Sequence, residues 1–385
     1  MGNRLERAKD DEMQRINWVT AVFLIATPLV ALSWGGVHVA LAGVSALDVS
    51  IFLLYLAATN MSITAGYHRL FAHRAYECRR FVKVFYLLFG AATFQHSVLS
   101  WASDHRRHHQ HIDRDGDPYN IRRGFFWAHI GWLLVNDHKP ERFANVQDLL
   151  ADPWVRWQHR FYIPIAIAMG FGFPLAVGTA IGHPWGCLLW AGVIRTVVGH
   201  HSTFLVNSLA HTVGKRPYSL AVSARDSVVT ALLTFGEGYH NFHHRFAADY
   251  RNGVRRYQWD PTKWLIRAMA ATGWAWNLRR APRERIVAAQ LQCDMQQLLD
   301  RMKGASEQAI SHMRERVSEI AGAVQRAAVR LGGLERELAH DRRRARRPHL
   351  SSMRAELRAA RREFREARRR WYAALAEFQA EPQPA

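Results

Sequence analysis

Apolar and charged segments alternate along the first 280 residues of the chain. Four apolar runs approach the ~20 residues that a helix needs to cross the hydrocarbon of a bilayer. They are residues 18–34, 47–65, 161–181 and 185–206. Short links join the first run to the second and the third to the fourth, so the pattern predicts two membrane-spanning helical hairpins. Buried core helices of a soluble protein are the alternative, and the alternation of apolar pairs with basic segments argues against them.

The positions of lysine and arginine predict the orientation of these hairpins. The links inside the hairpins carry neither residue, whereas the N-terminus, residues 68–160 and the chain after His211 are rich in arginine. Because basic segments stay on the cytoplasmic side of a membrane, we expect both termini and the long middle segment there. The aromatic stretch 81–94 is short for a span, and we expect it to form a helix lying at the membrane interface.

Polar residues interrupt the fourth apolar run at Arg195, His200 and His201. Such side chains are costly in lipid and must face protein or a water-filled cavity. Packing inside the helical bundle explains them nearly as well as a function does, so no role is assigned to them.

The last hundred residues have a different character and predict a basic helical tail over residues 285–385, after a membrane domain over residues 1–280. Apolar residues recur there at helical spacing, as in Ile310, Met313, Val317, Ile320 and Val324. This period predicts two long amphipathic helices in a coiled-coil hairpin, with breaks at Gly332-Gly333 and at Arg347-Pro348. The arginine run 342–347 either binds anionic lipid head groups or nucleic acid, or forms a solvated turn.

Composition adds two constraints. The formal net charge of +20 indicates an anionic partner, and the absence of a base-reading motif favours membrane lipids over nucleic acid. The three cysteines, Cys78, Cys187 and Cys293, are far apart in the sequence. They exclude a disulfide scaffold and form no CxxC metal motif.

Histidines gather in three clusters within the basic segments. The clusters are His68 with His73, then His105, His108 and His109, then His240, His243 and His244. On a helix, positions i, i+3 and i+4 share one face, so each HxxHH cluster directs its imidazoles to one side. A scattered surface role would suit a single histidine but does not explain repeated clusters. Neutral imidazole suits iron, zinc, copper or nickel, and eight histidines exceed the needs of one ion, so a two-metal centre is predicted.

Other polar residues lie at helical spacing from these clusters. Asn207 and His211 are i and i+4, so one helix face could present both to the metals. Asp104 and Glu237 are carboxylates that could accept hydrogen bonds from the ring N–H groups of the histidines. Either acid could equally be an ordinary helix cap or a surface residue.

The histidine clusters belong to a longer set of motifs. The set comprises residues 68–73 (HRLFAH), 101–109 (WASDHRRHH), 117–118 (DP), 122–132 (RRGFFWAHIGW), 207–211 (NSLAH), 214–218 (GKRPY) and 236–244 (GEGYHNFHH). In these motifs, in their order and in their spacing, the chain resembles the integral-membrane fatty acyl desaturases of the stearoyl-CoA desaturase type. The resemblance runs from about residue 47 to about residue 274. It implies an all-α fold, in which a four-span transmembrane bundle and a cytosolic helical cap hold a di-iron site next to a narrow tunnel for an acyl chain.

The resemblance also implies the ligands of that site. Two iron (Fe²⁺) ions would be held by nine histidines, with Asn207 acting through a water molecule. The nine are His68, His73, His105, His108, His109, His211, His240, His243 and His244. The implied reaction is O₂-dependent insertion of a cis double bond, typically at the ninth carbon, in the inner membrane of a bacterium. A membrane di-iron hydroxylase is the alternative enzyme, and a non-catalytic basic membrane protein that stores metal is the alternative outside enzymes.

The chain carries no fused redox module that its motifs reveal. It has no cysteine pattern for an iron–sulfur cluster and no HPGG haem motif. A separate electron donor is therefore expected, either a ferredoxin or a protein like cytochrome b5 with its reductase.

Two positions depart from the family pattern. The animal enzymes have a basic residue before the aspartate of the second histidine cluster, where this chain has Ser103, and an Arg-Lys pair where it has Asn136-Asp137. Those basic residues help to hold the phosphates of coenzyme A. An acyl-CoA remains the expected substrate, and a membrane glycerolipid stays open as the acyl carrier.

Overall fold

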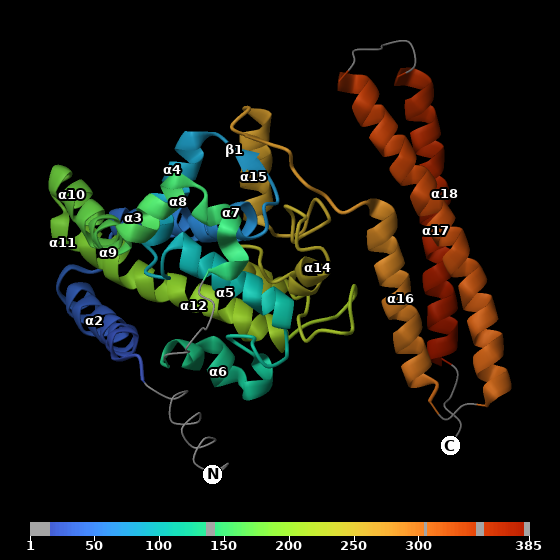
Figure 1. Ribbon diagram of the computed structural model, residues 1–385, viewed down its shortest axis with the longest axis horizontal. Coiled ribbons are helices and arrows are strands. Elements are labelled where there is room, and N and C mark those ends of the chain that lie inside the picture. Colours follow the sequence, from blue (N-terminus) through green and yellow to red (C-terminus); the bar gives the residue numbers. More distant parts are fainter. Residues whose placement is uncertain (1–15, 136–142, 304–305, 344–349, 381–385) are drawn as a thin grey trace. The chain divides into compact units, whose positions relative to one another are not determined.

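The computed structural model describes residues 16–135, 143–303, 306–343 and 350–380 (Figure 1). The chain divides into two compact units, each described below by itself. The first contains Met1–Lys215 and Val222–Arg280, and the second contains Arg216–Ala221 and Ala281–Ala385.

Among the described residues of the first unit, three helical stretches are long and apolar enough to cross a membrane, and they match the first three predicted spans. The first is α2, Trp18–Ala42. The second combines α3, Ala46–Met61, with the π-helix η1, Ser62–Ala72. The third combines α9, Tyr162–Ile167, the π-helix η5, Ala168–Gly172, and α10, Phe173–Ala180. These three helical stretches identify the chain as a membrane protein.

The predicted end of the first span at residue 34 is wrong. Helix α2 continues through Gly35-Gly36 for about two further turns and ends at Ala42. Glycine weakens a helix by about 1 kcal/mol but does not end it when the surroundings favour the helix. Gly35 is buried in α2, and a Cβ added there would make an ordinary van der Waals contact of 3.6 Å with the side chain of Ile194.

The fourth predicted run is also helical, but it is not among the described helices that are apolar enough to span. It consists of α11, Pro184–Cys187, the π-helix η6, Leu188–Ile194, and α12, Arg195–Asn207. The buried guanidinium of Arg195 donates to the backbone carbonyls of Ala191 (2.8 Å), Ala92 (2.7 Å) and Gly170 (3.2 Å). These contacts support packing within the bundle as the role of Arg195, and the fourth span stays a prediction.

Two further helices pack on η1 and form the core of the first unit. They are α4, Arg80–Ala91, and α5, Val98–His111. Glycines allow the close approach of α4 to η1, because a Cβ on Gly66 would lie 2.7 Å from Tyr86 and a Cβ on Gly90 would overlap the ring of Tyr67. Helix α4 buries Tyr86 and exposes Phe81, which fits the predicted amphipathic helix, while its place at the membrane interface stays a prediction.

Short helices complete the first unit. They are η2, Ile121–Arg123, α6, Phe125–His129, η3, Gly131–Leu133, η4, Ala144–Val146, α7, Gln147–Leu150, α8, Pro153–Arg160, η7, Leu209–His211, α13, Val228–Leu233, α14, His240–Arg245, and α15, Pro261–Ala271. Strands β1, Glu77–Cys78, and β2, Ala275–Trp276, pair antiparallel. This two-residue ladder is the only sheet in the described part of the chain, so it is a small exception to the predicted all-α fold.

The described residues of the second unit form three helices, not two. They are α16, Arg283–Arg301, α17, Glu307–Arg343, and α18, Leu350–Ala380, and α17 and α18 run side by side (Figure 1). Their apolar residues form one buried cluster that includes Leu298, Val317 and Trp371. The predicted break at Gly332-Gly333 is wrong, since α17 continues through it and buries Leu331 in the same cluster. The other predicted break, at Arg347-Pro348, lies outside the described residues.

Candidate metal centre

The structure brings all nine predicted histidines together in the first unit, as two groups of ring nitrogens. One group contains His68, His73, His105, His109 and His243, and the other contains His108, His211, His240 and His244. Within each group one nitrogen of every ring lies within 4.8 Å of the others. Each group can therefore hold a metal ion.

Helices α5 and α14 direct their HxxHH clusters as predicted. His105, His108 and His109 lie on α5, and the last cluster forms the short helix α14. In each cluster the first and third histidines join one group and the second joins the other: His105 and His109 join the first group and His108 the second, whereas His240 and His244 join the second and His243 the first. A single helix thus supplies ligands to both groups.

The His68 and His73 pair is explained by the π-helix η1. The amide of His73 donates to the carbonyl of His68 over 3.0 Å, which is the i to i+5 hydrogen bond of a π-turn. On an α-helix, residues five apart point in different directions, but one π-turn returns the chain to the same side. Both rings therefore enter the same group.

Ring nitrogens in the first group lie as close as ligands of one ion. The Nε2 atoms of His68 and His243 are 3.0 Å apart, those of His109 and His243 are 3.0 Å apart, and those of His73 and His105 are 2.7 Å apart. Metal–nitrogen bonds of about 2.0–2.1 Å place neighbouring ligand atoms about 3 Å apart. The observed spacing fits this requirement.

The second group shows the same spacing, and one of its ring nitrogens lacks a hydrogen-bond partner. The Nε2 atom of His244 lies 3.0 Å from that of His240 and 3.3 Å from that of His108. The Nε2 atom of His211 is buried without a hydrogen-bond partner. A buried polar atom without a partner is costly, and a metal ion at this position would remove that cost.

Burial favours the neutral form of seven of these rings. Burial, followed by the neighbouring histidines, holds the pKa values of six rings well below the ordinary histidine value, namely those of His73, His105, His109, His240, His243 and His244. Burial also lowers the pKa of His211 to about 3. The ring lone pairs are therefore available for metal ligation at neutral pH.

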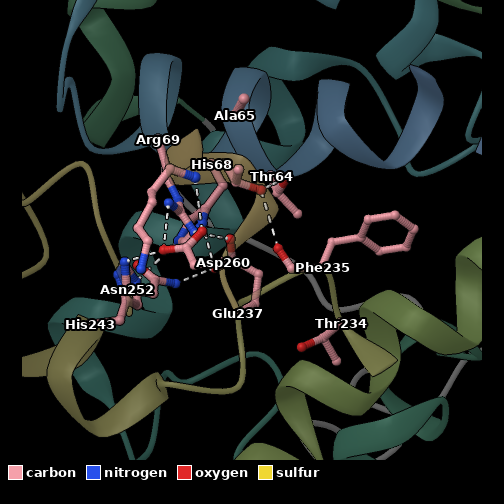
Figure 2. Close-up of polar contacts among 12 residues, drawn as sticks. Thr64, Ala65, His68, Arg69, Thr234, Phe235, Glu237, His243, Asn252 and Asp260 are labelled. Atoms are coloured by element: carbon pink, nitrogen blue, oxygen red, sulfur yellow. Dashed lines mark hydrogen bonds and ion pairs between the residues drawn. The ribbon is translucent and has the colours of Figure 1, made fainter. Parts of the chain in front are cut away.

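Glu237 contacts a ring N–H group, as predicted (Figure 2). Its carboxylate lies 2.9 Å from Nδ1 of His68, accepts from Arg69 at 2.9 Å, and accepts from Asn252 at 2.6 Å. Burial alone would raise the pKa of Glu237, but His68 and Arg69 lower it to about 2. Arg69 in turn lies 3.0 Å from Asp260, so a buried charge network fixes the orientation of the His68 ring.

Asp117 orients a second ring, a role that the sequence analysis missed. Its Oδ1 lies 2.8 Å from Nδ1 of His108, and its Oδ2 accepts from the amide of Asp113 at 3.1 Å. The turn after α5, with positive φ at Asp113 and Gly116, folds the chain back so that Asp117 reaches the helix. The signal in the sequence is the pair Asp117-Pro118, which by itself indicates a turn and not a contact with a histidine.

Ser223 and Asp113 orient the ring of His211, and the sequence analysis missed these too. Nδ1 of His211 donates to Ser223 Oγ at 2.7 Å, and Ser223 donates to Asp113 at 2.5 Å. The predicted carboxylate Asp104 lies 3.7 Å from Arg107, and its role toward a ring stays a prediction. Asn207, the last residue of α12, lines the cavity described next, and its contact through water is also still a prediction.

An apolar cavity of about 260 Å³ ends at the histidines. Its walls include Phe23 of α2, Ile163 of α9 and Phe204 of α12, and His68 and His240 lie at its metal-group end. The lining admits an apolar molecule up to the histidine groups. Among the departures from the family pattern, Ser103 donates to Asn145 at 2.8 Å, whereas Asn136-Asp137 lies outside the described residues.

The fold and site define a helical membrane protein with two histidine groups for metal at the end of an apolar cavity. The family model named Fatty acid desaturase matches residues 48–280, and the chain belongs to this family.

Named relatives agree with this membership. The chain is 42% identical over 293 residues to "Probable acyl-CoA desaturase" of Schizosaccharomyces pombe, covering 75% of this chain and 60% of the relative. It is 38% identical over 290 residues to "Acyl-CoA desaturase 1" of Saccharomyces cerevisiae, covering 74% and 56%. It is 39% identical over 246 residues to "Stearoyl-CoA desaturase 5" of Homo sapiens, covering 62% and 73%. The chain thus spans less than two thirds of the length of the two fungal relatives.

Proposed function

We propose that this protein is a fatty acyl desaturase that uses O₂ and two external electrons to insert a cis double bond into a saturated acyl chain. The observation that carries the proposal is the convergence of nine histidines in two groups at the end of an apolar cavity. The family and the names of the relatives support the same reaction. The ninth carbon is the expected position, in keeping with the relatives that are named for stearoyl-CoA.

Two iron ions are the proposed metals, held by the nine histidines, with Asn207 acting through a water molecule. Bound iron would supply O₂ activation and the oxidising power to remove hydrogen from an unactivated methylene group. The neutral rings and the unpartnered Nε2 of His211 support ligation by the histidines. The family is metal-dependent, and histidine nitrogen suits iron.

The residues behind the histidines set the direction of their lone pairs. Glu237, Asp117 and Ser223 contact the Nδ1 atoms of His68, His108 and His211. With Nδ1–H engaged in this way, each Nε2 lone pair points toward its group. The network therefore prepares the site before metal binds.

The cavity would hold the acyl chain against the metal groups and exclude water from the reacting carbons. Among its polar lining residues, Gln95 donates to Thr203 at 3.0 Å. An acyl-CoA is the proposed substrate. Ser103, which donates to Asn145, supplies no basic group at that position. A glycerolipid carrier is therefore the alternative, and the experiment below distinguishes it from acyl-CoA.

We further infer a four-span bundle whose termini and histidine groups face the cytoplasm, with a separate donor of the ferredoxin or cytochrome b5 type supplying electrons. Support comes from the three apolar spans and from the arginine-rich segments around the histidines. The relatives named above are fungal and mammalian, so the bacterial inner membrane rests on the sequence-based expectation alone.

Acyl profiling by mass spectrometry tests the proposal. Cells expressing the intact chain should accumulate a monounsaturated acyl chain that requires O₂, and His244→Ala should abolish it. His111→Ala is the matched control, because His111 ends α5 outside both groups and its loss should leave the product unchanged. The pool in which the product first appears, acyl-CoA or glycerolipid, names the carrier, and a hydroxylated product would replace the desaturase by a hydroxylase.

A further inference from the structure

Helix α18 of the second unit carries seven arginines on one face. They are Arg354, Arg358, Arg361, Arg362, Arg365, Arg368 and Arg369. At 3.6 residues per turn they fall within an arc of about 120° and extend over about 22 Å of helix. No aspartate or glutamate of α18 lies within this arc, so the face is uniformly basic. We call these seven residues the arginine face.

The four glutamates of α18, Glu356, Glu363, Glu366 and Glu377, lie outside this arc, and two of them pair with α17. Glu363 lies 2.8 Å from Arg330 and Glu377 lies 2.8 Å from Arg316, both on α17. These ion pairs direct two of the four glutamates toward arginines of α17 and away from the arginine face.

Most of the arginine face is exposed. Arg354, Arg358, Arg362, Arg365 and Arg369 are all exposed to solvent. The other two lie at the edge of the face, where Arg361 is 3.4 Å from Glu335 and Arg368 donates to the hydroxyl of Tyr372 at 2.7 Å. Five guanidinium groups are therefore free to meet an anionic surface together.

The apolar side of α18 is already occupied. Leu357, Phe364 and Trp371 lie in the buried cluster of the three-helix unit. An amphipathic helix that inserts into a bilayer needs an open apolar face, which α18 lacks. Any partner of the arginine face must therefore be bound by charge and hydrogen bonds at a surface.

We propose that the arginine face docks on the anionic phospholipid head groups of a bilayer. Guanidinium groups match phosphate oxygens in a bidentate geometry, and a straight row of five suits a flat array of phosphates. The chain itself links this unit to a membrane protein, because α16 begins at Arg283, three residues after the first unit ends at Arg280. Three residues span at most about 10 Å, so a short link tethers this unit to the unit that carries the membrane spans. This proposal is independent of the reaction assigned to the metal centre.

Arginine modification tests the docking on the full-length protein. The protein is reconstituted in bilayers of phosphatidylcholine alone or with about one third phosphatidylglycerol, treated with phenylglyoxal, and analysed by peptide mass spectrometry. The five exposed arginines of the face should react about threefold more slowly, or slower still, in the anionic bilayer, and high salt should remove the difference. Arg314 and Arg326, which are exposed on α17, should react at equal rates in both bilayers. Equal rates at the arginine face, or equal protection of Arg314 and Arg326, would overturn the proposal.

A variant pair and a competitor complete the test. Arg358→Gln with Arg365→Gln should reduce the protection of Arg354, Arg362 and Arg369, whereas Arg314→Gln with Arg326→Gln should leave it unchanged. A short DNA duplex is added to the phosphatidylcholine sample as a second probe. If the duplex protects the face and phosphatidylglycerol does not, the partner is a nucleic acid and the lipid proposal is wrong.

Discussion

Glu237 is the carboxylate whose removal should most directly weaken the metal centre. Its charge holds both the His68 ring and the buried Arg69 guanidinium. Glu237→Gln should lower metal affinity by about 10- to 100-fold, because an outer partner fixes the orientation and basicity of a histidine ligand. Metal titration with elemental analysis measures the effect. Glu77→Gln is the control, since Glu77 bonds Trp276 and Asn277 away from the histidines, and full metal content in Glu237→Gln would contradict the assigned contact.

Asp226 gives the fold a predictable pH dependence. Its Oδ1 accepts from the amides of Asn241 and Phe242 at 2.8 Å and 3.1 Å, in the first turn of α14. Burial raises the pKa of Asp226 to about 7, against the lowering effect of these two amides. Between pH ~4 and pH ~7 the folded chain keeps a proton that the unfolded chain has lost, so the free energy of unfolding falls as pH rises through this window.

An asparagine at this position keeps the acceptor oxygen and cannot ionise. Asp226→Asn should therefore stabilise the protein at pH 8, where the cost of the charge is fully present. Since Asp226 is only partly buried, we expect about 1 kcal/mol, or roughly 2–4 °C in the melting temperature. Thermal melts in detergent at pH 8 and pH 5 measure it. An equal gain at both pH values would show that the charge is not the cause.

At the scale of helices and strands, the sequence pattern predicts those features of the site that depend only on the geometry of a single helix. The HxxHH spacing needs only an α-helix to place His105 and His109 on one side, and the sequence therefore predicts it. The pairing of His68 with His73 needs a π-turn, which arises from packing around η1 and leaves no period in the sequence. Asp117 acts through a turn with two positive φ values, so its distance from His108 along the chain does not reveal its distance in space.

Tertiary contacts also decide where helices end. Gly35-Gly36 and Gly332-Gly333 look like breaks from propensity alone. Both pairs continue a helix: Gly35 is itself buried in α2, and Leu331, next to the second pair, lies in the buried cluster of α17. Burial of these turns outweighs a glycine cost of about 1 kcal/mol per residue. The sequence shows the cost, whereas the compensating contacts appear only in the fold.

An atom added where α4 crosses η1 should destabilise the folded protein. A Cβ on Gly66 would lie 2.7 Å from Cβ and Cγ of Tyr86, and Tyr86 is almost fully buried. Gly66→Ala should destabilise the protein by about 1–3 kcal/mol through overpacking. It should also reduce metal content, because η1 carries His68. Melting temperature and metal analysis together measure this.

Gly36→Ala is the matched control for that substitution. A Cβ there would meet nothing within 4 Å, and alanine favours a helix interior by up to about 1 kcal/mol. We expect unchanged or slightly raised stability and unchanged metal content. If Gly36→Ala lost as much metal as Gly66→Ala, the close crossing would not be the reason for the loss.

At the scale of the whole molecule, the histidine groups and the arginine face belong to different units. All nine histidines and the cavity lie in the first unit, whereas the arginine face lies in the second. Truncation after Arg280 should therefore keep metal content and desaturation, while the loss of α18 removes the arginine face. Arg216–Ala221 groups with the second unit, and Gln297 donates to the carbonyl of Arg216 at 3.5 Å. The truncated chain should therefore melt at a lower temperature, since this segment loses its packing. Iron analysis, product assay and thermal melts on the two chains test this division, and loss of iron after truncation would show that the second unit is needed to form the metal centre.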